Sequence, residues 1–339
     1  MVFSINEKYA PYLAVCLKSL AVHVAVDERY RIIVMCDNVK NITMIQLRNV
    51  IKDYENIDIE FVDIRKKMHE FSESFGQTVT DRQENRLYSG EFTLTIYFRL
   101  FIAELFPELD KAVYIDSDTV INDDIAKLYS VDMGDAMFGA VRDTFAGKNT
   151  ILAHYIENVV GIERNEYVNS GVLVMNLDKM RRTHLADIFL KLMAEYHFDS
   201  VAPDQDYINA ICAKDIYFLD KEWNVMPNKG GEYMARPKLI HFNLFDKPWH
   251  YSEIPYEEYF WQYAAESGFY PLLIKQRERY GDSERSADRE NLKKLLARAE
   301  NIADGDGVKF SDVVGNRFVE NSDFVRDSDF VRDSSDAVK

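Results

Sequence analysis

The sequence predicts an α/β fold with a mostly parallel central sheet and helices on both of its faces. Apolar runs typical of buried strands alternate with helix-like segments through residues 1–250, and this alternation favours parallel strands joined by helices. A chain of 339 residues, 47% of them hydrophobic, is long enough to bury one large core. The expected strands are residues 31–35, 57–62, 112–115, 136–141 and 171–175.

The remaining elements of this part follow from local patterns. A first strand begins at once and turns near Tyr9, and residues 92–106 have a helix-like pattern. Residues 206–212 predict another helix, with Asp204 and Asp206 near its positive end. Residues 237–242 predict a short strand that ends close to His241.

The C-terminal part predicts helices followed by a tail. Residues 251–303 are rich in aromatic side chains, and residues 288–303 carry apolar residues at helical spacing. Three uses of the aromatic segment stay open: an appendage that covers the core, a platform for an acceptor sugar, and a foot at a membrane interface. Residues 304–339 predict a flexible acidic tail, in which the hexamer at 322–327 recurs at 328–333.

The most informative motif is Asp116-Ser117-Asp118, which directly follows the apolar run at 112–115. Side chains two residues apart in an extended segment point to the same side, so the two carboxylates can converge on one divalent cation. The carboxyl ends of strands in α/β sheets are also where ligands bind. The motif therefore predicts a metal-held phosphate or diphosphate, although an Asp-rich turn that only closes the strand is the simpler alternative.

A phosphohydrolase of the haloacid-dehalogenase type is a rival interpretation of the same motif. In that class the first Asp is a nucleophile, and a second acidic pair after a later strand completes the Mg²⁺ site. The only candidate for this pair, Asp282, follows a charged stretch that cannot form a buried strand. The rival is therefore disfavoured.

A second group of residues fits transfer from a nucleotide sugar. His241 ends its predicted strand, and Lys247 follows six residues later. An imidazole added to two carboxylates favours Mn²⁺ over Mg²⁺, and the lysine can neutralise diphosphate oxygens. A structural histidine with no ligand is the alternative.

With these motifs in place, the chain resembles the family 8 retaining glycosyltransferases, a group with the GT-A fold that includes bacterial lipooligosaccharide galactosyl- and glucosyltransferases and glycogenin. The resemblance covers roughly residues 1–250, and the short motifs occur in the order of the family. They lie at residues 2–6, 9–12, 97–100, 114–118, 169–172, 203–206 and 241–249.

The resemblance implies a role for each matching position on the donor side. Asp116, Asp118 and His241 would bind the metal, expected to be Mn²⁺ with Mg²⁺ as the alternative, and Lys247 would contact the donor phosphates. The uridine of the donor would lie against Ser4, Asn6 and Tyr9, and Ser117 is a further expected substrate-binding residue. The family more often has Asp at the position of Asn6, so this contact changes from a carboxylate to an amide.

Other matching positions are expected near the transferred sugar. Arg99 resembles a family arginine close to the donor, with a surface ion pair as the alternative, whereas Phe101 replaces a lysine found in some members. Asp143 is expected near the hexose hydroxyls, with helix capping as the alternative. Asn169 and Ser170 are expected to contact the sugar or acceptor, with a glycine-containing bulge as the alternative.

Asp204 and Gln205 are the expected catalytic residues. The resemblance places Asp204 on the sugar hydroxyls and Gln205 on the face of the anomeric carbon opposite the leaving diphosphate. Retention by double displacement needs a nucleophile on that face, and an amide is a poor one. The resemblance therefore implies front-face attack, in which the acceptor hydroxyl enters on the side of the leaving group.

Bulk properties restrict the partners. A net charge of −16 argues against nucleic acid or an anionic membrane as a general partner. Cys16, Cys36 and Cys212 lack disulfide or metal spacing, which suits a reducing cytoplasm. No signal peptide or membrane span is expected, so the predicted location is cytoplasmic or peripheral to the inner face of a membrane, with homo-oligomerisation left open.

The sequence thus predicts a metal-dependent retaining transferase that moves glucose or galactose from a UDP-sugar. The acceptor would be a free glycan or a lipid- or protein-linked saccharide. A nucleotide-sugar binding protein without turnover is the second hypothesis, and the phosphohydrolase is the third.

Overall fold

The computed structural model describes residues 1–67, 94–227 and 233–314. The first two residues of the predicted helix at 92–106 and the repeats at 316–333 lie outside the described residues. No helix in the described ranges is long and apolar enough to cross a membrane.

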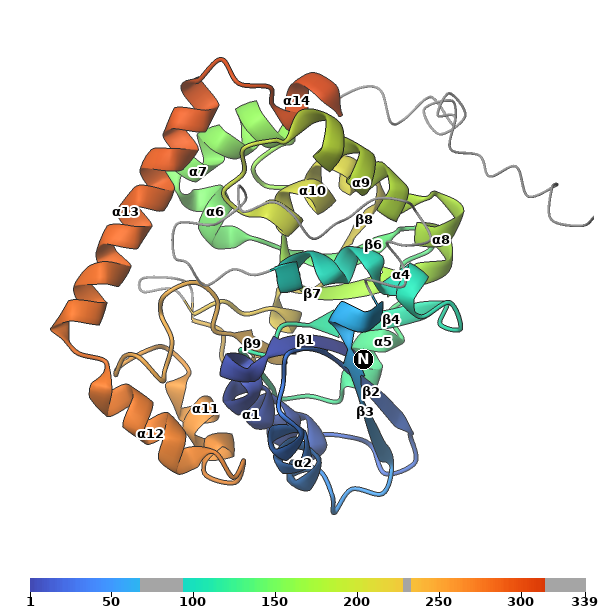
Figure 1. The fold of residues 1–339 in the computed structure, drawn as a ribbon, viewed down its shortest axis with the longest axis vertical. Helices are drawn as coiled ribbons and strands as arrows, with labels where there is room; N and C mark the ends of the chain where they lie inside the picture. Colours follow the sequence, from blue (N-terminus) through green and yellow to red (C-terminus); the bar gives the residue numbers. More distant parts are fainter. Residues whose placement is uncertain (68–93, 228–232, 315–339) are drawn as a thin grey trace, which may run out of the picture.

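A seven-stranded mixed sheet forms the centre of the molecule, in the order β3-β2-β1-β4-β7-β6-β8 (Figure 1). The strands confirm the predicted runs and are β1 Val2–Asn6, β2 Tyr30–Asp37, β3 Ile57–Asp63, β4 Lys111–Ile115, β6 Phe138–Arg142, β7 Val168–Asn176 and β8 Ile216–Phe218. All neighbouring pairs are parallel except those made by β7, which runs antiparallel to both β4 and β6. The mostly parallel α/β prediction is therefore confirmed.

The reversed strand β7 determines where the site lies. The carboxyl ends of β1, β4 and β6 point to one edge of the sheet, and β7 contributes its amino end to the same edge because it runs the other way. Asn6, Asp116, Asp143 and Asn169 lie at these strand ends or directly next to them. Polar residues from distant parts of the sequence therefore meet at one edge.

A small second sheet brings the predicted histidine to this edge. It consists of β5 Thr119–Ile121 and β9 Leu239–His241, paired antiparallel with Thr119 opposite His241. Since β5 starts directly after Asp118, this register places the histidine beside the acidic motif.

Helices cover both faces of the large sheet, as predicted, with α8–α10 on one side and α1 and α2 on the other (Figure 1). Side chains alternate across β4, so Tyr114 packs in one core whereas Val113 and Ile115 pack in the other. The helices up to α10 are α1 Ala10–Ala21, α2 Asn41–Val50, α4 Ile102–Leu105, α5 Ile125–Tyr129, α6 Thr144–Lys148, α7 Thr150–Tyr155, α8 Leu177–Arg182, α9 Leu185–Tyr196 and α10 Pro203–Cys212.

Two of these helical segments differ in detail from the prediction. The described part of the stretch 92–106 is helical, but Leu94–Phe101 form the tighter 3-10 helix η3 before α4. Helix α10 begins at Pro203, three residues before the predicted start, with proline at a position where its missing N–H costs nothing. Asp204 and Gln205 therefore lie in the first turn of α10.

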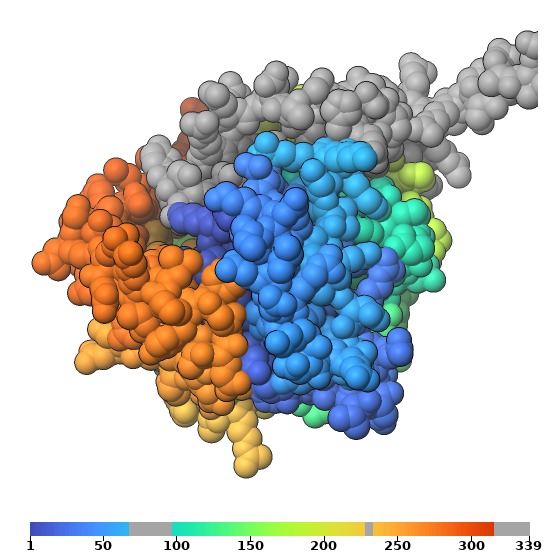
Figure 2. All heavy atoms as spheres, turned by 60° about the horizontal axis from the view of Figure 1, so that its bottom comes forward, coloured from blue at the N-terminus to red at the C-terminus, as the bar shows by residue number. Residues whose placement is uncertain are grey.

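The C-terminal part packs along the core of residues 1–250 and does not form a separate layer. Helix α11 (Glu257–Ala264) packs on α1, and Figure 2 shows the α11–α12 segment in orange against the N-terminal segment in blue. Trp249, Phe260 and Tyr263 are buried there, so these aromatic residues cover the core. Helices α12 (Tyr270–Arg279), α13 (Asp282–Asp304) and α14 (Phe310–Val313) follow, and α13 contains the predicted helix at 288–303.

An acidic residue in this fold gives its stability a defined pH dependence. Glu104 lies on α4, and burial raises the pKa of its carboxyl from 4.5 to about 7. Its Oε2 atom has no hydrogen-bond partner among the described residues. Between pH 4.5 and 7 the unfolded chain ionises Glu104 while the folded chain keeps it protonated, so stability falls as the pH rises through this window.

We therefore expect Glu104→Gln to stabilise the protein by about 2 kcal/mol at pH 8, a value discounted for partial exposure, and by clearly less at pH 5. Urea unfolding at both pH values measures the difference. The exposed Glu55→Gln serves as control and should change little. A gain that is equal at the two pH values would contradict this assignment.

Candidate active site

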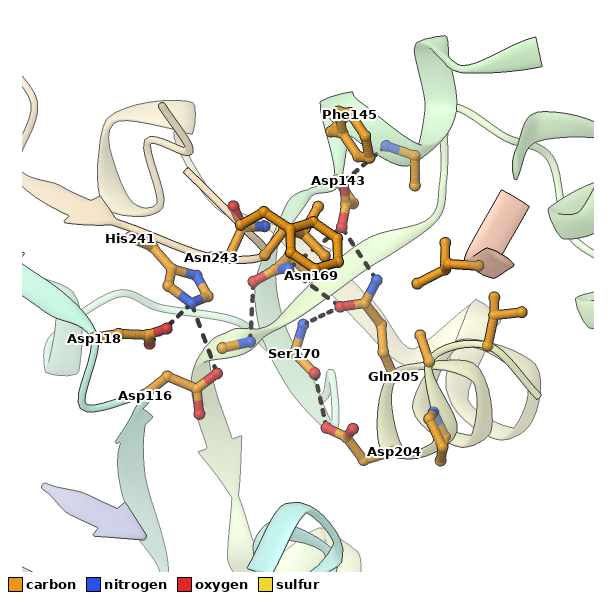
Figure 3. A pocket seen from close by; sticks show the side chains of 18 of the residues that line it. Asp116, Asp118, Asp143, Phe145, Asn169, Ser170, Asp204, Gln205, His241 and Asn243 are labelled. Atoms are coloured by element: carbon orange, nitrogen blue, oxygen red, sulfur yellow. Dashed lines mark hydrogen bonds and ion pairs between the residues drawn. The ribbon is translucent and has the colours of Figure 1, made fainter. Parts of the chain in front are cut away.

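A cavity of about 520 Å³ opens at the edge of the sheet where the polar strand ends meet, within the size range of small-molecule sites. All predicted site residues line it: Ser4, Asn6, Tyr9, Arg99, Asp116, Ser117, Asp118, Asp143, Asn169, Ser170, Asp204, Gln205, His241 and Lys247. Figure 3 shows Asp116, Asp118 and His241 on one side and Gln205 on the other, with Ser170 between them.

Asp116, Asp118 and His241 form the one cluster with metal-ligand geometry among the described residues, with ligand atoms within 4.8 Å of one another. The Nε2 atom of His241 lies 3.4 Å from Asp118 Oδ1 and 3.7 Å from Asp116 Oδ2. Each carboxylate uses its other oxygen elsewhere. Asp116 Oδ1 accepts from Arg99 and Tyr114, and Asp118 Oδ2 accepts from Lys247.

Hydrogen bonds determine which nitrogen of His241 carries a proton. The backbone N–H of Gly171 donates to Asn169 Oδ1, so this atom is the amide oxygen. Asn224 must then donate to Asn169 Oδ1 with its NH₂ group, which turns the Asn224 oxygen towards His241 Nδ1. Nδ1 therefore donates, and Nε2 presents a lone pair to the two acids.

These donors fit a divalent cation. Two carboxylate oxygens and an imidazole nitrogen face one another, each held by a partner on its far side, and such a set suits a transition-metal ion. Burial alone would raise the pKa of Asp118, but the charge of Lys247 and its hydrogen bond to Oδ2 outweigh it and hold this pKa well below its usual range. The carboxylate is therefore ionised and ready to bind a cation.

Arg99 is buried and contacts three parts of the site. It is therefore not the surface ion-pair partner that was considered as its alternative. Its guanidinium contacts Asp116 Oδ1 at 3.0 Å and Asp204 Oδ2 at 3.1 Å, and it donates to the carbonyl of Ser170. It also lies 4.3 Å from the centre of the Tyr114 ring. Phe101, two residues after Arg99, is buried in the core, where its ring packs against the ring of Phe189.

The amide of Gln205 is fixed by its surroundings. Its Oε1 atom accepts from Asn169 Nδ2 and Ser170 N, each at 3.1 Å. Its Nε2 atom donates to Asp143 Oδ2, also at 3.1 Å. Asp143 combines this contact with the helix-capping role considered as its alternative, since its Oδ1 atom accepts from Ala146 N.

Residues expected on the nucleotide side lie at the end of β1. The Oδ1 atom of Asn6 accepts from the N–H groups of Lys8 and Tyr9, so its oxygen caps the turn, and its NH₂ group donates to none of the described residues. Ser4 and Tyr9 are partly exposed, and Ser117 is buried. Lys247 donates to Asp118 and to the Phe242 carbonyl, each at 2.5 Å.

Asp282, the acid considered for the phosphohydrolase interpretation, does not line the cavity. Asp282 is exposed in the first turn of α13 and is absent from the residues that line the cavity. Asp282 therefore cannot complete a Mg²⁺ site with Asp116 and Asp118, as the phosphohydrolase interpretation requires.

Sequence reasoning missed Asn224, Tyr114 and the cavity-facing residues of α13. Asn224 is 2% exposed and orients His241, but it belongs to no motif and lies outside every predicted element. Tyr114 stands in the apolar run before the acidic motif, where its ring predicts only core packing. No signal in a single sequence would have found either role.

Gly171 is required by the close approach of His241 and Asp116 to its backbone. A Cβ atom at this position would lie 2.2 Å from His241 Cε1 and 2.7 Å from Asp116 Oδ2. We expect Gly171→Ala to displace both groups and to weaken Mn²⁺ binding about 10- to 100-fold, as measured by calorimetric titration in the presence of UDP. Gly307→Ala is the control, because a Cβ atom there meets nothing within 4 Å. Unchanged binding by Gly171→Ala would mean that these side chains are not ligands.

Comparisons with known proteins agree with this geometry. The model of "Glycosyl transferase family 8" matches residues 1–253. A putative glycosyltransferase of Haemophilus influenzae is 27% identical over 227 residues, which cover 67% of this chain and 63% of that protein. The lipopolysaccharide 1,2-glucosyltransferase of Escherichia coli is 25% identical over 185 residues, which cover 50% of this chain and 54% of that protein.

Two solved structures share the fold. The bifunctional glycosyltransferase WbbM aligns with a TM-score of 0.69 and 23% identity, covering 82% of this chain and 51% of WbbM. The galactosyltransferase LgtC, in complex with donor and acceptor sugar analogues, aligns with a TM-score of 0.60 and 24% identity. The alignment covers 78% of this chain and 94% of LgtC. This chain thus spans about half to two thirds of WbbM and of the two sequence relatives. Since the family model covers most of its length, the chain belongs to glycosyl transferase family 8 and has the GT-A fold.

Proposed function

We propose that this glycosyltransferase moves a hexose, glucose or galactose, from a UDP-sugar to a glycan or glycoconjugate acceptor with retention of configuration and with a divalent metal. The observation that carries the proposal is the Asp116–Asp118–His241 cluster, which opens on the same cavity as Gln205. Two of the similar proteins are a glucosyltransferase and a galactosyltransferase, which supports a hexose donor.

The donor would lie along the sheet edge, from the end of β1 to the metal cluster. Ser4, Asn6 and Tyr9 would hold the uridine, with Ser117 beside the metal-binding acids. Two of the three N–H donors of the Lys247 ammonium are used by Asp118 and Phe242. The third is available for a diphosphate oxygen.

Asp116 Oδ2, Asp118 Oδ1 and His241 Nε2 would hold the metal. When bound, the cation neutralises charge on the diphosphate and acts as a Lewis acid on the departing UDP. The imidazole ligand favours Mn²⁺ over Mg²⁺. Arg99 and Tyr114 hold Asp116 in place for this role through its second oxygen.

The contacts of Gln205 argue against a covalent intermediate. An amide is a weak nucleophile, and here both lone pairs of its oxygen accept hydrogen bonds. The neighbouring acids are also engaged, Asp204 by Arg99 and Ser170 and Asp143 by Gln205. We therefore propose that Gln205 stabilises positive charge at the anomeric carbon by its dipole.

The reaction would then proceed on one face of the sugar. The bond between the anomeric carbon and the diphosphate oxygen breaks, and the acceptor oxygen bonds to the same carbon from the same side. The acceptor proton passes to the departing diphosphate oxygen. Asp204 and Asp143 would fix the hexose hydroxyls during this step.

Removing both metal-binding carboxylates tests the proposal. We expect Asp116→Asn with Asp118→Asn to reduce Mn²⁺-dependent UDP release from the preferred UDP-hexose by at least about 100-fold. A panel of UDP-sugars with Mn²⁺ or chelator provides the measurement. The exposed pair Asp53→Asn with Asp58→Asn is the matched control. UDP release that survives both chelator and the double substitution would exclude a metal at this cluster.

Gln205→Ala tests the proposed role of the amide. We expect kcat to fall about 10²- to 10³-fold, as for the loss of one electrostatic donor, while the Kd for UDP stays within about twofold because Gln205 lies away from the metal cluster (Figure 3). Initial rates and UDP titration separate the two quantities. Gln46→Ala on the exposed side of α2 is the control. A change confined to UDP affinity would place Gln205 in nucleotide binding instead.

A further inference from the structure

The cavity continues past the proposed donor site to a wall made by α13, which lies beyond the residues that match the family model. The residues of α13 that line it are Asp288, Asn291, Leu292, Leu295 and Arg298. Their spacing of three, four, seven and ten residues places them on one face of the helix. A single face of α13 is therefore turned to the substrate cavity along about three turns.

Helix α13 is anchored at several points, so this wall is fixed. The hydroxyl groups of Tyr251 and Tyr280 both donate to Asp288 Oδ2 at 2.6 Å. Arg298 pairs with Asp199 in the loop before α10, and Ala299 is fully buried in the core. Figure 1 shows α13 running along one side of the molecule from α12 to α14, beside α7.

Besides the polar residues Asp288, Asn291 and Arg298 of α13, this part of the cavity is lined by a group of apolar side chains. We call it the annex and define it by six lining residues: Phe145, Leu152, Ile156, Val201, Leu292 and Leu295. Leu152, Ile156 and Val201 are at most 6% exposed and form its floor. Helices α6 and α7, the loop before α10 and α13 each contribute to it.

The annex lies at the Gln205 end of the cavity. Phe145 follows two residues after Asp143, whose carboxylate binds the Gln205 amide. Val201 lies two residues before Pro203, the first residue of the helix that carries Gln205. The annex therefore borders the place where the sugar would be transferred.

A UDP-sugar cannot satisfy this lining. Uridine, diphosphate and hexose hydroxyls all lose hydrogen bonds to water when they enter an apolar wall without partners. The transfer reaction needs a second substrate in the same cavity, and an apolar group gains free energy when it is buried there. The annex thus matches a part of the acceptor other than its sugar.

We propose that the acceptor is a saccharide carried on an apolar group, and that the annex binds this group while the sugar lies beside Gln205. This inference rests on the proposed transferase function, because it assigns the occupant of that site. An alkyl chain and an aromatic ring share the required chemistry. The experiment distinguishes between them.

The test compares glycosides that differ only in the group attached to the sugar. Methyl, phenyl and n-octyl β-D-glucosides and β-D-galactosides are titrated into the full chain with saturating UDP and Mn²⁺, below the micelle-forming concentration of the octyl compounds. We expect the octyl or the phenyl glycoside to bind at least about tenfold more tightly than the methyl glycoside. The tighter of the two identifies the kind of group.

Variants on α13 locate the binding. The double variant Leu292→Asn with Leu295→Asn makes the annex polar, whereas Leu292→Phe fills it without adding polarity. Each variant should reduce the preference for the octyl or phenyl glycoside over the methyl glycoside to within about twofold. Ala297→Asn on the exposed side of the same helix is the matched control and should keep the preference. UDP binding is measured for every variant, since intact binding shows that the protein is folded.

The outcomes separate the two proposals. Equal binding of methyl, phenyl and octyl glycosides overturns the annex assignment, and so does a preference that persists in both Leu292 variants. A chain that prefers the apolar glycosides but does not bind UDP contradicts the proposed function and leaves the annex assignment in place.

Discussion

The buried guanidinium of Arg99 is the interaction on which the geometry of the site depends. It connects the end of β4 through Asp116, the start of β7 through the Ser170 carbonyl, and the first turn of α10 through Asp204. Burial alone would lower the pKa of Arg99, but the two carboxylates outweigh this and hold it above its usual range. A buried charge without partners is costly, so any rearrangement that separates these three elements is opposed. Asp116 and the first turn of α10, which carries Gln205, are thereby held at a fixed separation.

The strands could be predicted from sequence because buried strands are short apolar runs bounded by polar residues, and all the runs predicted in this way became strands. The direction of β7, in contrast, could not be predicted from the sequence. Its segment Val172–Leu173–Val174–Met175 is apolar on both faces and has the same pattern in either direction. Direction is decided by the connections: β7 enters at the edge where β6 and α7 end, and Asn209 of α10 pairs with both backbone groups of Val168 there. That pairing is a long-range contact, which no local pattern contains.

In the candidate site, too, local features could be predicted from the sequence whereas long-range contacts could not. Asp116 and Asp118 were predicted to converge because their spacing in an extended segment is a local property, and the structure brings His241 to them through the pairing of β5 with β9. Asn224 and Tyr114 escaped prediction because their roles exist only after folding. Helix α13 shows the limit most clearly. Its apolar spacing predicted a helix and an apolar face, but not that Leu292 and Leu295 of that face would line the substrate cavity.

The C-terminal helices also pack behind α10, the helix that carries Gln205, so the candidate site depends on more than the family-matched residues. Phe310 of α14 is fully buried, and its ring packs against Phe198 at 4.1 Å and Tyr207 at 4.9 Å. Tyr207 lies on α10, two residues after Gln205, and Asp206 between them accepts hydrogen bonds from Tyr155, Tyr167 and Ser200. The amide of Gln205 can be oriented on the cavity side of α10 because the opposite side is packed by these groups. Residues 254–314 thus contribute both a wall of the cavity and part of the packing that holds α10, so the candidate site includes residues beyond those that the family model matches.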